Sequence, residues 1–454
     1  MVNVERANPA DGWFRLLRRG LFPAWALFAV AVWAPPVAWS AEIPSVAPEQ
    51  VGLSSERLER LTGRMNALVE EGAMVGGLGL IARRGRVAYE EVYGQADREA
   101  GRPMALDTIF RIYSMSKPIT SVAVMMLYEE GEFLLNDPVA LYLPELADLQ
   151  VARSTGDGDA SAVGQTRAAS RQPTIGDLLK HTAGFTYDFF RQTEVDALYR
   201  DAELMTPQQS LEGFTAALGK LPLHNDPGSR WHYSVSVDVQ GALVQAVSGL
   251  SFGEFLKRRI FDPLGMTDTS FTAPEETWPR IAQLYSPPGA FEEDGASEPT
   301  AAGNGLVVAD DWVSDGYREG AVFEGGGGGL LSTARDYLRF CQMLLNGGAL
   351  DGVRLLSPKT VELMTTDHLG GLPMGLAGEG AGYGFGLGFA VAKDQGAIGE
   401  LGSVGEYSWG GAAGTSFWID PAEELVGIFM VQVIPPPDRM STLFQTLAYQ
   451  AIVD

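Results

Sequence analysis

Residues 110–120 read FRIYSMSKPIT, and the S-x-x-K spacing of Ser114 and Lys117 is the feature on which the predicted fold and chemistry depend. Pro118 suits the first turn of a helix, so a helix is expected from Ser114 to just before Gly131. Ser114 then lies at the helix N-terminus, and Lys117 faces the same way one turn later. Backbone amides at such a terminus favour the negative charge of an attacking oxygen and of an oxyanion. Taken alone, the motif fits equally well with a serine that only caps the helix.

Two further stretches complete a pattern with this motif. Residues 233–235 read YSV, and residues 409–412 read WGGA just ahead of two strands expected within 417–432. In this order and at these separations, the three motifs resemble the serine β-lactamase-like superfamily. That group includes class C β-lactamases, penicillin-binding D-alanyl peptidases and family VIII carboxylesterases. Residues 178–185 (LLKHTAGF) and 261–271 (FDPLGMTDTSF) support the resemblance, which covers nearly the whole chain after residue 40.

The resemblance implies a β-lactamase/transpeptidase-like fold, α/β plus all-α, with an antiparallel sheet flanked by helices and an inserted helical domain. It also implies that Ser114 is the nucleophile and that Lys117 and Tyr233 share proton transfer. The backbone N–H groups of Ser114 and Ala412 would form the oxyanion hole. Lysine and tyrosine both have unperturbed pKa values near 10, so either one needs a shift to act as a base at neutral pH. Which of the two is the base stays open at this point.

Two positions depart from the pattern of β-lactamases and peptidases. Trp409 stands where Lys or His is usual, and Val235 stands where Asn is usual. A neutral indole and an isopropyl group cannot bind the carboxylate and amide of a β-lactam or peptide, whereas an uncharged ester does not require those contacts. The Trp-Gly-Gly form is typical of the esterase branch. The predicted substrate-binding residues are Tyr113, Tyr187, Val235, Trp409, Gly410 and Gly411, although core packing explains Tyr187 equally well.

The sequence therefore predicts a serine hydrolase that cleaves carboxylic esters with short to medium acyl chains. The alternative is activity on β-lactams or D-alanyl peptides. A second alternative, from a different class, is a non-catalytic penicillin-binding-like sensor. The presence of Ser114, Lys117 and Tyr233 together argues against the sensor, since a site without catalytic function does not require all three residues.

Composition excludes several other classes of protein. The 454 residues carry 33 Lys+Arg against 57 Asp+Glu, a net charge of −24, which argues against a nucleic-acid partner. The single cysteine, Cys341, permits neither an intramolecular disulfide nor a Cys-based zinc site. The four histidines include no HExxH spacing, so no metal and no cofactor are expected, and the expected partner is a small-molecule ester. Nothing in the sequence indicates an oligomeric state.

Residues 1–40 are predicted to be a signal peptide. Arg15, Arg18 and Arg19 precede an uncharged run over residues 20–41, and an Ala-x-Ser pattern places cleavage between Ser40 and Ala41. The run is also about long enough for a membrane anchor, but three prolines within it favour cleavage. A periplasmic or secreted bacterial protein is expected, with no stable membrane partner unless the signal is uncleaved.

The order of β-rich and helical patterns predicts a discontinuous α/β domain of residues 41–135 and 305–454, interrupted by a helical domain with loop insertions over residues 136–304. A β-hairpin is expected over residues 75–93 with its turn near Gly85. Glycine alternates with apolar residues over 382–389, which predicts one strand with an apolar face and a bare face.

One motif points to a different nucleophile. Residues 249–253 (GLSFG) match the G-x-S-x-G elbow, in which Ser251 would use His368, the only downstream histidine. Such an elbow follows a strand, and the preceding pattern is helical. Gly249 is therefore expected to end that helix, with Ser251 and Glu254 capping the next one.

The remaining polar and glycine-rich features have structural interpretations. His181 is expected to hold a turn by hydrogen bonding, while His224 and His232 line the cleft or lie on the surface. Residues 325–329 are five glycines with no following Gly-Lys-Ser/Thr, so a flexible link into a helix over 333–345 is predicted.

Overall fold

The computed structural model describes residues 42–153, 165–190, 192–290, 305–309, 317, 322–375 and 382–454. The predicted signal peptide lies outside these residues and stays a prediction. No helix within the described ranges has both the length and the apolar character needed to cross a bilayer. Residues 40–454 form one compact unit, and the domain boundaries near residues 135 and 305 stay a prediction.

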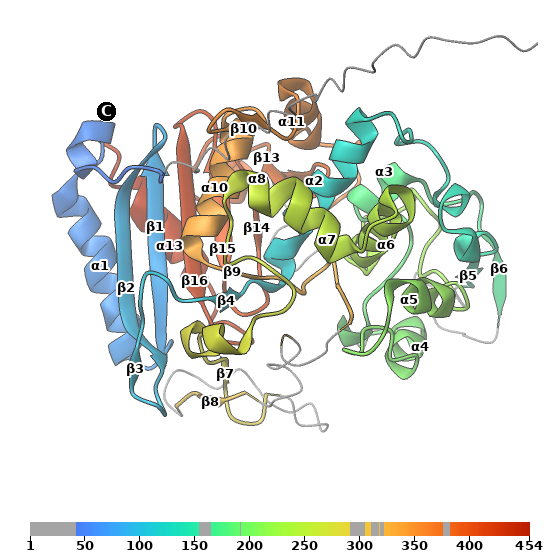
Figure 1. Ribbon diagram of the computed structural model, residues 1–454, viewed down its shortest axis with the longest axis horizontal. Helices are drawn as coiled ribbons and strands as arrows, with labels where there is room; N and C mark the ends of the chain where they lie inside the picture. Colours follow the sequence, from blue (N-terminus) through green and yellow to red (C-terminus); the bar gives the residue numbers. More distant parts are fainter. Residues whose placement is uncertain are drawn as a thin grey trace, which may run out of the picture. The chain divides into compact units, whose positions relative to one another are not determined.

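An antiparallel sheet of eight strands runs in the order β12-β13-β14-β15-β16-β1-β2-β3 (Figure 1). Strands from the two ends of the chain meet where β16 pairs with β1. The predicted antiparallel sheet flanked by helices is therefore confirmed. The strands are β1 (Gly76–Arg83), β2 (Arg86–Asp97), β3 (Arg102–Pro103), β12 (Tyr383–Phe385), β13 (Ala390–Ala392), β14 (Tyr407–Gly410), β15 (Ser416–Asp420) and β16 (Leu425–Val431).

Helices cover both faces of this sheet. Along β16, Val426, Ile428 and Met430 pack into the core with α2 and α10, whereas Phe429 and Val431 pack into the core with α1 and α13. Helices α6 and α7 pack against α2, and α3 and α5 pack against α6 (Figure 1). The α-helices are α1 (Ser55–Glu70), α2 (Ser116–Glu129), α3 (Ile175–Leu179), α4 (Glu194–Asp201), α5 (Leu211–Leu218), α6 (Ser236–Ser248), α7 (Phe252–Leu256), α8 (Asp262–Leu264), α10 (Ala334–Leu345), α11 (Pro358–Met364), α12 (Gln395–Ile398) and α13 (Met440–Tyr449).

Short paired strands tie loops to this core. They are β4 (Phe110–Arg111) with β9 (Leu331–Ser332), β5 (Gln150–Ala152) with β6 (Thr166–Ala168), β7 (Tyr285–Ser286) with β8 (Val307–Val308), and β10 (Ala349–Leu350) with β11 (Val353–Arg354). The β4–β9 pair matters most for the site, because it fixes the segment that leads into α2.

The predicted hairpin is present, but the predicted glycine-rich strand is wrong in its length. Arg84 and Gly85 have positive φ angles of 53° and 71°, which suits the two-residue turn between β1 and β2. In the second case β12 ends at Phe385, and the chain turns back into β13. Gly388 has φ +98°, and a Cβ at Gly386 would collide with the carbonyl oxygen of Met364. Gly388 therefore permits a turn, and Gly386 permits the close approach of the Met364 backbone. The segment is not one continuous strand.

Candidate active site

Ser114 lies in a single 3-10 turn, η2 (Tyr113–Met115), between β4 and the start of α2 at Ser116. The α-helix thus begins two residues later than predicted. Tyr113, directly before Ser114, has φ 43°, an uncommon conformation for a residue with a side chain. The N–H of Ile112 donates to the carbonyl of Leu330 at 3.1 Å, which continues the β4–β9 pairing. This pairing holds the strained turn and presents Ser114 half-buried at the start of α2.

The three residues predicted to be catalytic come together at one atom. The Tyr233 hydroxyl donates to Ser114 Oγ at 2.7 Å, and Lys117 Nζ donates to the same oxygen at 3.1 Å. Lys117 Nζ also lies 4.5 Å from the centroid of the Tyr233 ring. Tyr233 is buried in the segment just before α6. Two groups able to exchange a proton therefore contact the candidate nucleophile directly.

Burial decides the charge of Lys117, whose side chain is only 2% exposed. Its Nζ donates to the carbonyl oxygen of Gly327 at 2.6 Å and lies 5.3 Å from the centroid of the Tyr187 ring. Loss of solvent disfavours the ammonium form and lowers the pKa of Lys117 to about 7, although the nearby charge of Asp238 acts in the opposite direction. A large fraction of Lys117 is therefore neutral at physiological pH.

Gly327 and Asp238 are site residues that the sequence interpretation missed. Residues 325–329 were expected to be a flexible link, but they form a turn packed into the site. The N–H of Gly327 donates to Asp238 Oδ1 at 2.9 Å, and Thr120 donates to the carbonyl of Gly326 at 2.8 Å. A Cβ at Gly326 would lie 2.6 Å from the carbonyl oxygen of Val237, so these glycines allow close packing. The sequence contained one signal for this part of the site, because Asp238 is a charged residue among the mostly small and apolar residues of α6.

The predicted second oxyanion donor, Ala412, lies in the turn after β14. The N–H of Gly411 donates to the carbonyl of Thr415 at 2.7 Å, whereas the N–H of Ala412 has no acceptor among the described residues. A Cβ at Gly411 would collide with the carbonyl oxygen of Ile112, two residues before Ser114. This contact brings the Ala412 amide to the wall of the cavity that Ser114 also lines.

The cavity at Ser114 has a volume of about 1130 Å³. Its walls near Ser114 are mostly aromatic and aliphatic. They include Tyr113, Tyr187, Phe189, Met205, Phe323, Trp409, Gly410 and Gly411. Five of the six predicted substrate-binding residues thus line the cavity. Val235 does not, because its side chain is 1% exposed and packs in the core, while its N–H donates to the carbonyl of Thr186 at 3.3 Å.

Trp409 and Tyr187 both line this cavity and both pack near Tyr233. The Trp409 ring centroid lies 5.5 Å from that of Tyr233 and 5.4 Å from that of Phe385, to which it is perpendicular. Trp409 therefore supports Tyr233 as well as closing the cavity. Tyr187 stacks against Phe189 at 4.6 Å, so it is both packed and exposed to the cavity.

The histidine nearest the site has the predicted structural role. His181 has φ 54°, its Nδ1 accepts the N–H of Ser234 at 3.3 Å, and its ring centroid lies 4.9 Å from that of Tyr233. Burial, followed by the charge of Lys117, lowers the pKa of His181. A neutral imidazole therefore holds the turn that carries Tyr233.

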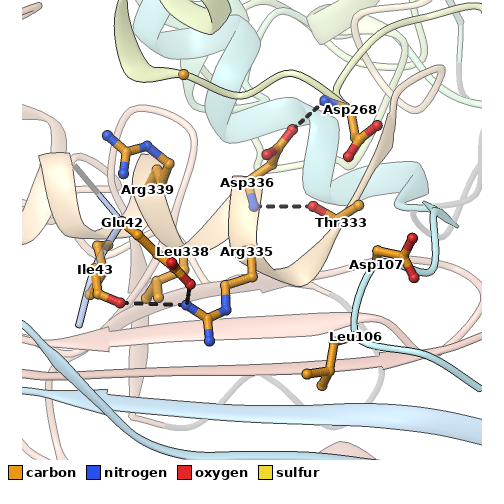
Figure 2. A pocket seen from close by; sticks show the side chains of 11 residues that line it. Glu42, Ile43, Leu106, Asp107, Asp268, Thr333, Arg335, Asp336, Leu338 and Arg339 are labelled. Carbon is orange, nitrogen blue, oxygen red and sulfur yellow. Dashed lines mark hydrogen bonds and ion pairs between the residues drawn. The ribbon is translucent and has the colours of Figure 1, made fainter. Parts of the chain in front are cut away.

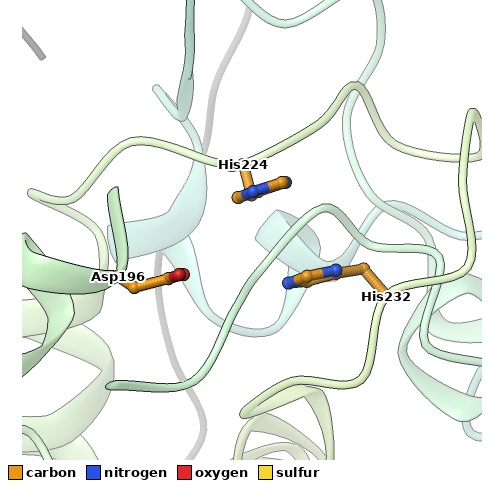
Figure 3. Close-up of side chains that lie close together, drawn as sticks. All are labelled: Asp196, His224 and His232. Carbon is orange, nitrogen blue, oxygen red and sulfur yellow. The ribbon is translucent and has the colours of Figure 1, made fainter. Parts of the chain in front are cut away.

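His224 and His232 lie with Asp196 in a cluster whose potential ligand atoms are within 4.8 Å of one another (Figure 3). The two imidazole rings stack at 4.5 Å with planes only 6° apart, so their in-plane lone pairs do not converge on one point. The Asp196 carboxylate already accepts hydrogen bonds from Thr186 Oγ1 at 2.7 Å and from the N–H of Thr193 at 3.0 Å. These donors do not fit a metal ion. Neither histidine lines the Ser114 cavity.

The competing G-x-S-x-G motif is structural, as predicted. Gly249, with φ 71°, ends α6, and Ser251 Oγ accepts the N–H of Glu254 at 3.2 Å as the cap of α7. His368 makes a 2.8 Å hydrogen bond with the carbonyl of Leu363. Neither Ser251 nor His368 lines the cavity at Ser114.

Comparison with known proteins agrees with this geometry. Residues 61–451 match the family described as Beta-lactamase. Protein Rv1367c of Mycobacterium tuberculosis is 35% identical over 374 residues, which cover 81% of this chain and 88% of that protein. Esterase EstB of Burkholderia gladioli is 31% identical over 369 residues, which cover 80% of this chain and 87% of EstB.

Among solved structures, EstCE1, described as a hydrolase with promiscuous acyltransferase activity, has a TM-score of 0.70 at 26% identity. The match covers 87% of this chain and 98% of EstCE1. The chain therefore belongs to the beta-lactamase family of serine hydrolases, in which its relatives include esterases and acyltransferases.

Proposed function

We propose that the protein hydrolyses uncharged carboxylic esters through an acyl-enzyme on Ser114. The observation that carries this proposal is the contact of one oxygen, Ser114 Oγ, with both Lys117 Nζ and the Tyr233 hydroxyl in a largely apolar cavity. A serine hydroxyl is a weak nucleophile without such a base.

In the first half of the reaction, neutral Lys117 takes the proton of Ser114 as Oγ attacks the ester carbonyl carbon. The backbone N–H groups of Ser114 and Ala412 bind the oxyanion that forms. When the tetrahedral species collapses, the bond to the alcohol oxygen breaks, and that oxygen receives the proton from Lys117 through the Tyr233 hydroxyl. The alcohol leaves, and the acyl group stays on Ser114.

In the second half, water takes the place of the alcohol. Water attacks the acyl carbon while its proton passes through the Tyr233 hydroxyl to neutral Lys117, and the same oxyanion site is used again. Collapse breaks the bond to Ser114 Oγ, which regains its proton, and the carboxylic acid leaves. The lowered pKa of Lys117 supports its role as the base in both halves.

The walls of the cavity favour a neutral substrate with an apolar acyl group. The lining cations are Lys117, which is engaged with Ser114 and Gly327, and Arg439, which is exposed next to Asp438 at the start of α13. Trp409 supplies a neutral surface where a cation would otherwise bind a carboxylate. A volume of about 1130 Å³ leaves room for acyl chains longer than those of simple model esters.

The proposal is tested by comparing hydrolysis of p-nitrophenyl esters of increasing acyl length with hydrolysis of a chromogenic cephalosporin. We expect kcat/KM for p-nitrophenyl butyrate to exceed that for the cephalosporin, and Ser114→Ala to abolish ester turnover. Cephalosporin turnover above ester turnover would overturn the ester assignment in favour of β-lactam hydrolysis. Absence of both activities would favour the non-catalytic sensor.

Acyl transfer is a second candidate, supported by the similarity to EstCE1. An alcohol bound in the wide cavity would attack the acyl-enzyme in place of water, giving a new ester and free Ser114. Mass analysis of the products with and without an added alcohol distinguishes the two outcomes, since hydrolysis alone yields only the acid.

A further inference from the structure

Asp238 also lines the cavity at Ser114, and its carboxylate has no task in the reaction described above. Asp238 is only 2% exposed, in the first turn of α6. Its Oδ1 accepts the N–H of Gly327 at 2.9 Å, and its Oδ2 accepts the hydroxyl of Tyr187 at 3.4 Å. A buried carboxylate is costly unless its contacts repay the lost solvation, so its presence beside the site calls for an explanation.

Gly327 links Asp238 to Lys117. Its N–H donates to Asp238, while its carbonyl oxygen accepts from Lys117 Nζ at 2.6 Å. The fit is close, because a Cβ at Gly327 would lie 2.6 Å from Asp238 Oδ2 and 2.7 Å from the Tyr187 hydroxyl. The carboxylate and the amine therefore hold the same glycine from two sides.

The contact with the Gly327 carbonyl also orients the amine. A neutral amine has two N–H donors and one lone pair. When one N–H of Lys117 is directed at the Gly327 oxygen, the lone pair is free to point at the hydroxyl of Ser114, 3.1 Å away. A shift of the glycine turn would rotate the amine away from Ser114.

We infer that Asp238 is a positioning residue of this site: it anchors Gly327 so that the Gly327 carbonyl keeps the Lys117 amine directed at Ser114. This inference rests on the proposed function of Ser114 and Lys117. It gives Gly326 and Gly327 a task as well, since a Cβ at either position would collide with α6.

The same carboxylate has an electrostatic effect on Lys117. The titratable groups that face Lys117 are Asp238 from α6, Tyr187, Tyr233 and His181, and Asp238 is the one carboxylate among them. Its negative charge favours the ammonium form and so raises the pKa of Lys117 against the effect of burial. Removal of that charge lets Lys117 lose its proton at a lower pH.

The test separates the charge of Asp238 from its hydrogen bond. Asp238→Asn keeps an oxygen that can accept the Gly327 N–H but removes the charge. We expect the acidic limb of kcat/KM to move down by about one pH unit or more, with little change in the alkaline plateau. Asp238→Ala removes both, and we expect its plateau kcat to fall by about 10- to 100-fold with KM little changed.

A matched control is a second buried carboxylate outside the site. Asp336, on α10, is 6% exposed and accepts the N–H of Asp268 at 2.8 Å and the hydroxyl of Thr269 at 2.9 Å. It lines a separate pocket of about 410 Å³ among charged side chains, including Arg335 and Arg339 (Figure 2). Asp336→Asn removes a buried charge without touching Lys117, so its acidic limb is expected to match that of the unmodified protein.

Gly327→Ala tests the same inference without altering Asp238. Its added methyl group would push apart the carboxylate and the glycine turn, so we expect kcat to fall while KM is retained. An unchanged plateau kcat in Asp238→Ala, or an unchanged kcat in Gly327→Ala, would overturn the positioning role of Asp238. An Asp238→Asn profile that superimposes on the unmodified one would overturn its electrostatic effect on Lys117. Equal shifts in Asp238→Asn and Asp336→Asn would also do so.

A readout that needs no substrate separates this inference from the proposed function. The rate at which a fluorophosphonate labels Ser114 is measured against pH for the same variants. Labelling of Ser114 with an acidic limb that Asp238→Asn does not move contradicts the role of Asp238 alone. No labelling of Ser114 in the unmodified protein contradicts the proposed function and, with it, the inference.

Discussion

The hydroxyl of Tyr233 lies 2.7 Å from Ser114 Oγ, although 119 positions separate the two residues in the chain. The turn before α2 presents the serine, and the segment before α6 presents the tyrosine. Lys117 reaches the same oxygen at 3.1 Å from the first turn of α2. The contacts of Ser114 Oγ therefore depend on the starts of two helices, α2 and α6, and residues at each start can be substituted separately.

Replacement of Tyr233 by phenylalanine should remove the hydroxyl while keeping the ring. The ring packs against His181 and Trp409, at centroid distances of 4.9 and 5.5 Å, so Tyr233→Phe should fold normally. We expect kcat to fall by about 10²- to 10⁴-fold, because the leaving alcohol loses its path to a proton. Stopped-flow measurement of p-nitrophenol release and a thermal melt check the two parts. A kcat close to that of the unmodified protein would exclude Tyr233 from proton transfer.

The pH dependence of ester hydrolysis should follow Lys117. Burial lowers the pKa of Lys117 to about 7, and only the neutral amine can accept the proton of Ser114. The rate should therefore rise with pH through about 7, by about tenfold per pH unit on the acidic side, and level off above it. Measurement of kcat/KM between about pH 5 and about pH 9 tests this expectation. A rate that falls as pH rises through 7 is incompatible with neutral Lys117 as the base.

Trp409→Lys should weaken ester hydrolysis without loss of the fold. The change removes an aromatic wall beside Tyr233 and adds a cation to the lining of the cavity. We expect kcat/KM for p-nitrophenyl butyrate to fall about tenfold or more. Trp409→Phe, which keeps an apolar ring, serves as the control and should lose less. Ester activity of the lysine variant equal to that of the unmodified protein would show that the neutral wall does not set substrate preference.

Gly411→Ala should impair the oxyanion site. The added methyl group would collide with the carbonyl oxygen of Ile112 and move the turn that carries the Ala412 amide. Loss of one oxyanion donor costs about 10²- to 10³-fold in kcat. Gly63→Ala in α1 is the matched control, because a Cβ at Gly63 meets no atom within 4 Å. Equal kcat values in the two variants would remove Ala412 from the oxyanion site.

The sequence predicted those parts of the fold whose signals are local. Arg84-Gly85 adopts the positive φ angles that a tight hairpin turn requires, and the hairpin was predicted there. Ser114 and Lys117 share one helical turn, so their proximity also followed from spacing. The contact of Tyr233 with Ser114 is long-range, and only the family resemblance predicted it.

The failures of sequence-based prediction have a common physical cause. Glycine permits both chain freedom and close packing, and sequence alone does not distinguish them. The sequence predicts a flexible link over residues 325–329, yet Gly326 and Gly327 are buried against α6. Val235 lies two residues after Tyr233, but α6 begins at the next residue, Ser236, and the side chain of Val235 packs in the core.

The central claim is that Ser114 is the nucleophile, and covalent labelling tests it most directly. The intact protein is treated with a fluorophosphonate, and peptide mass spectrometry locates the adduct in the unmodified protein, in Ser114→Ala and in Ser251→Ala. We predict one adduct on Ser114, present in Ser251→Ala and absent from Ser114→Ala. An adduct on Ser251, or the absence of any adduct from the folded, unmodified protein, would contradict the assignment of Ser114.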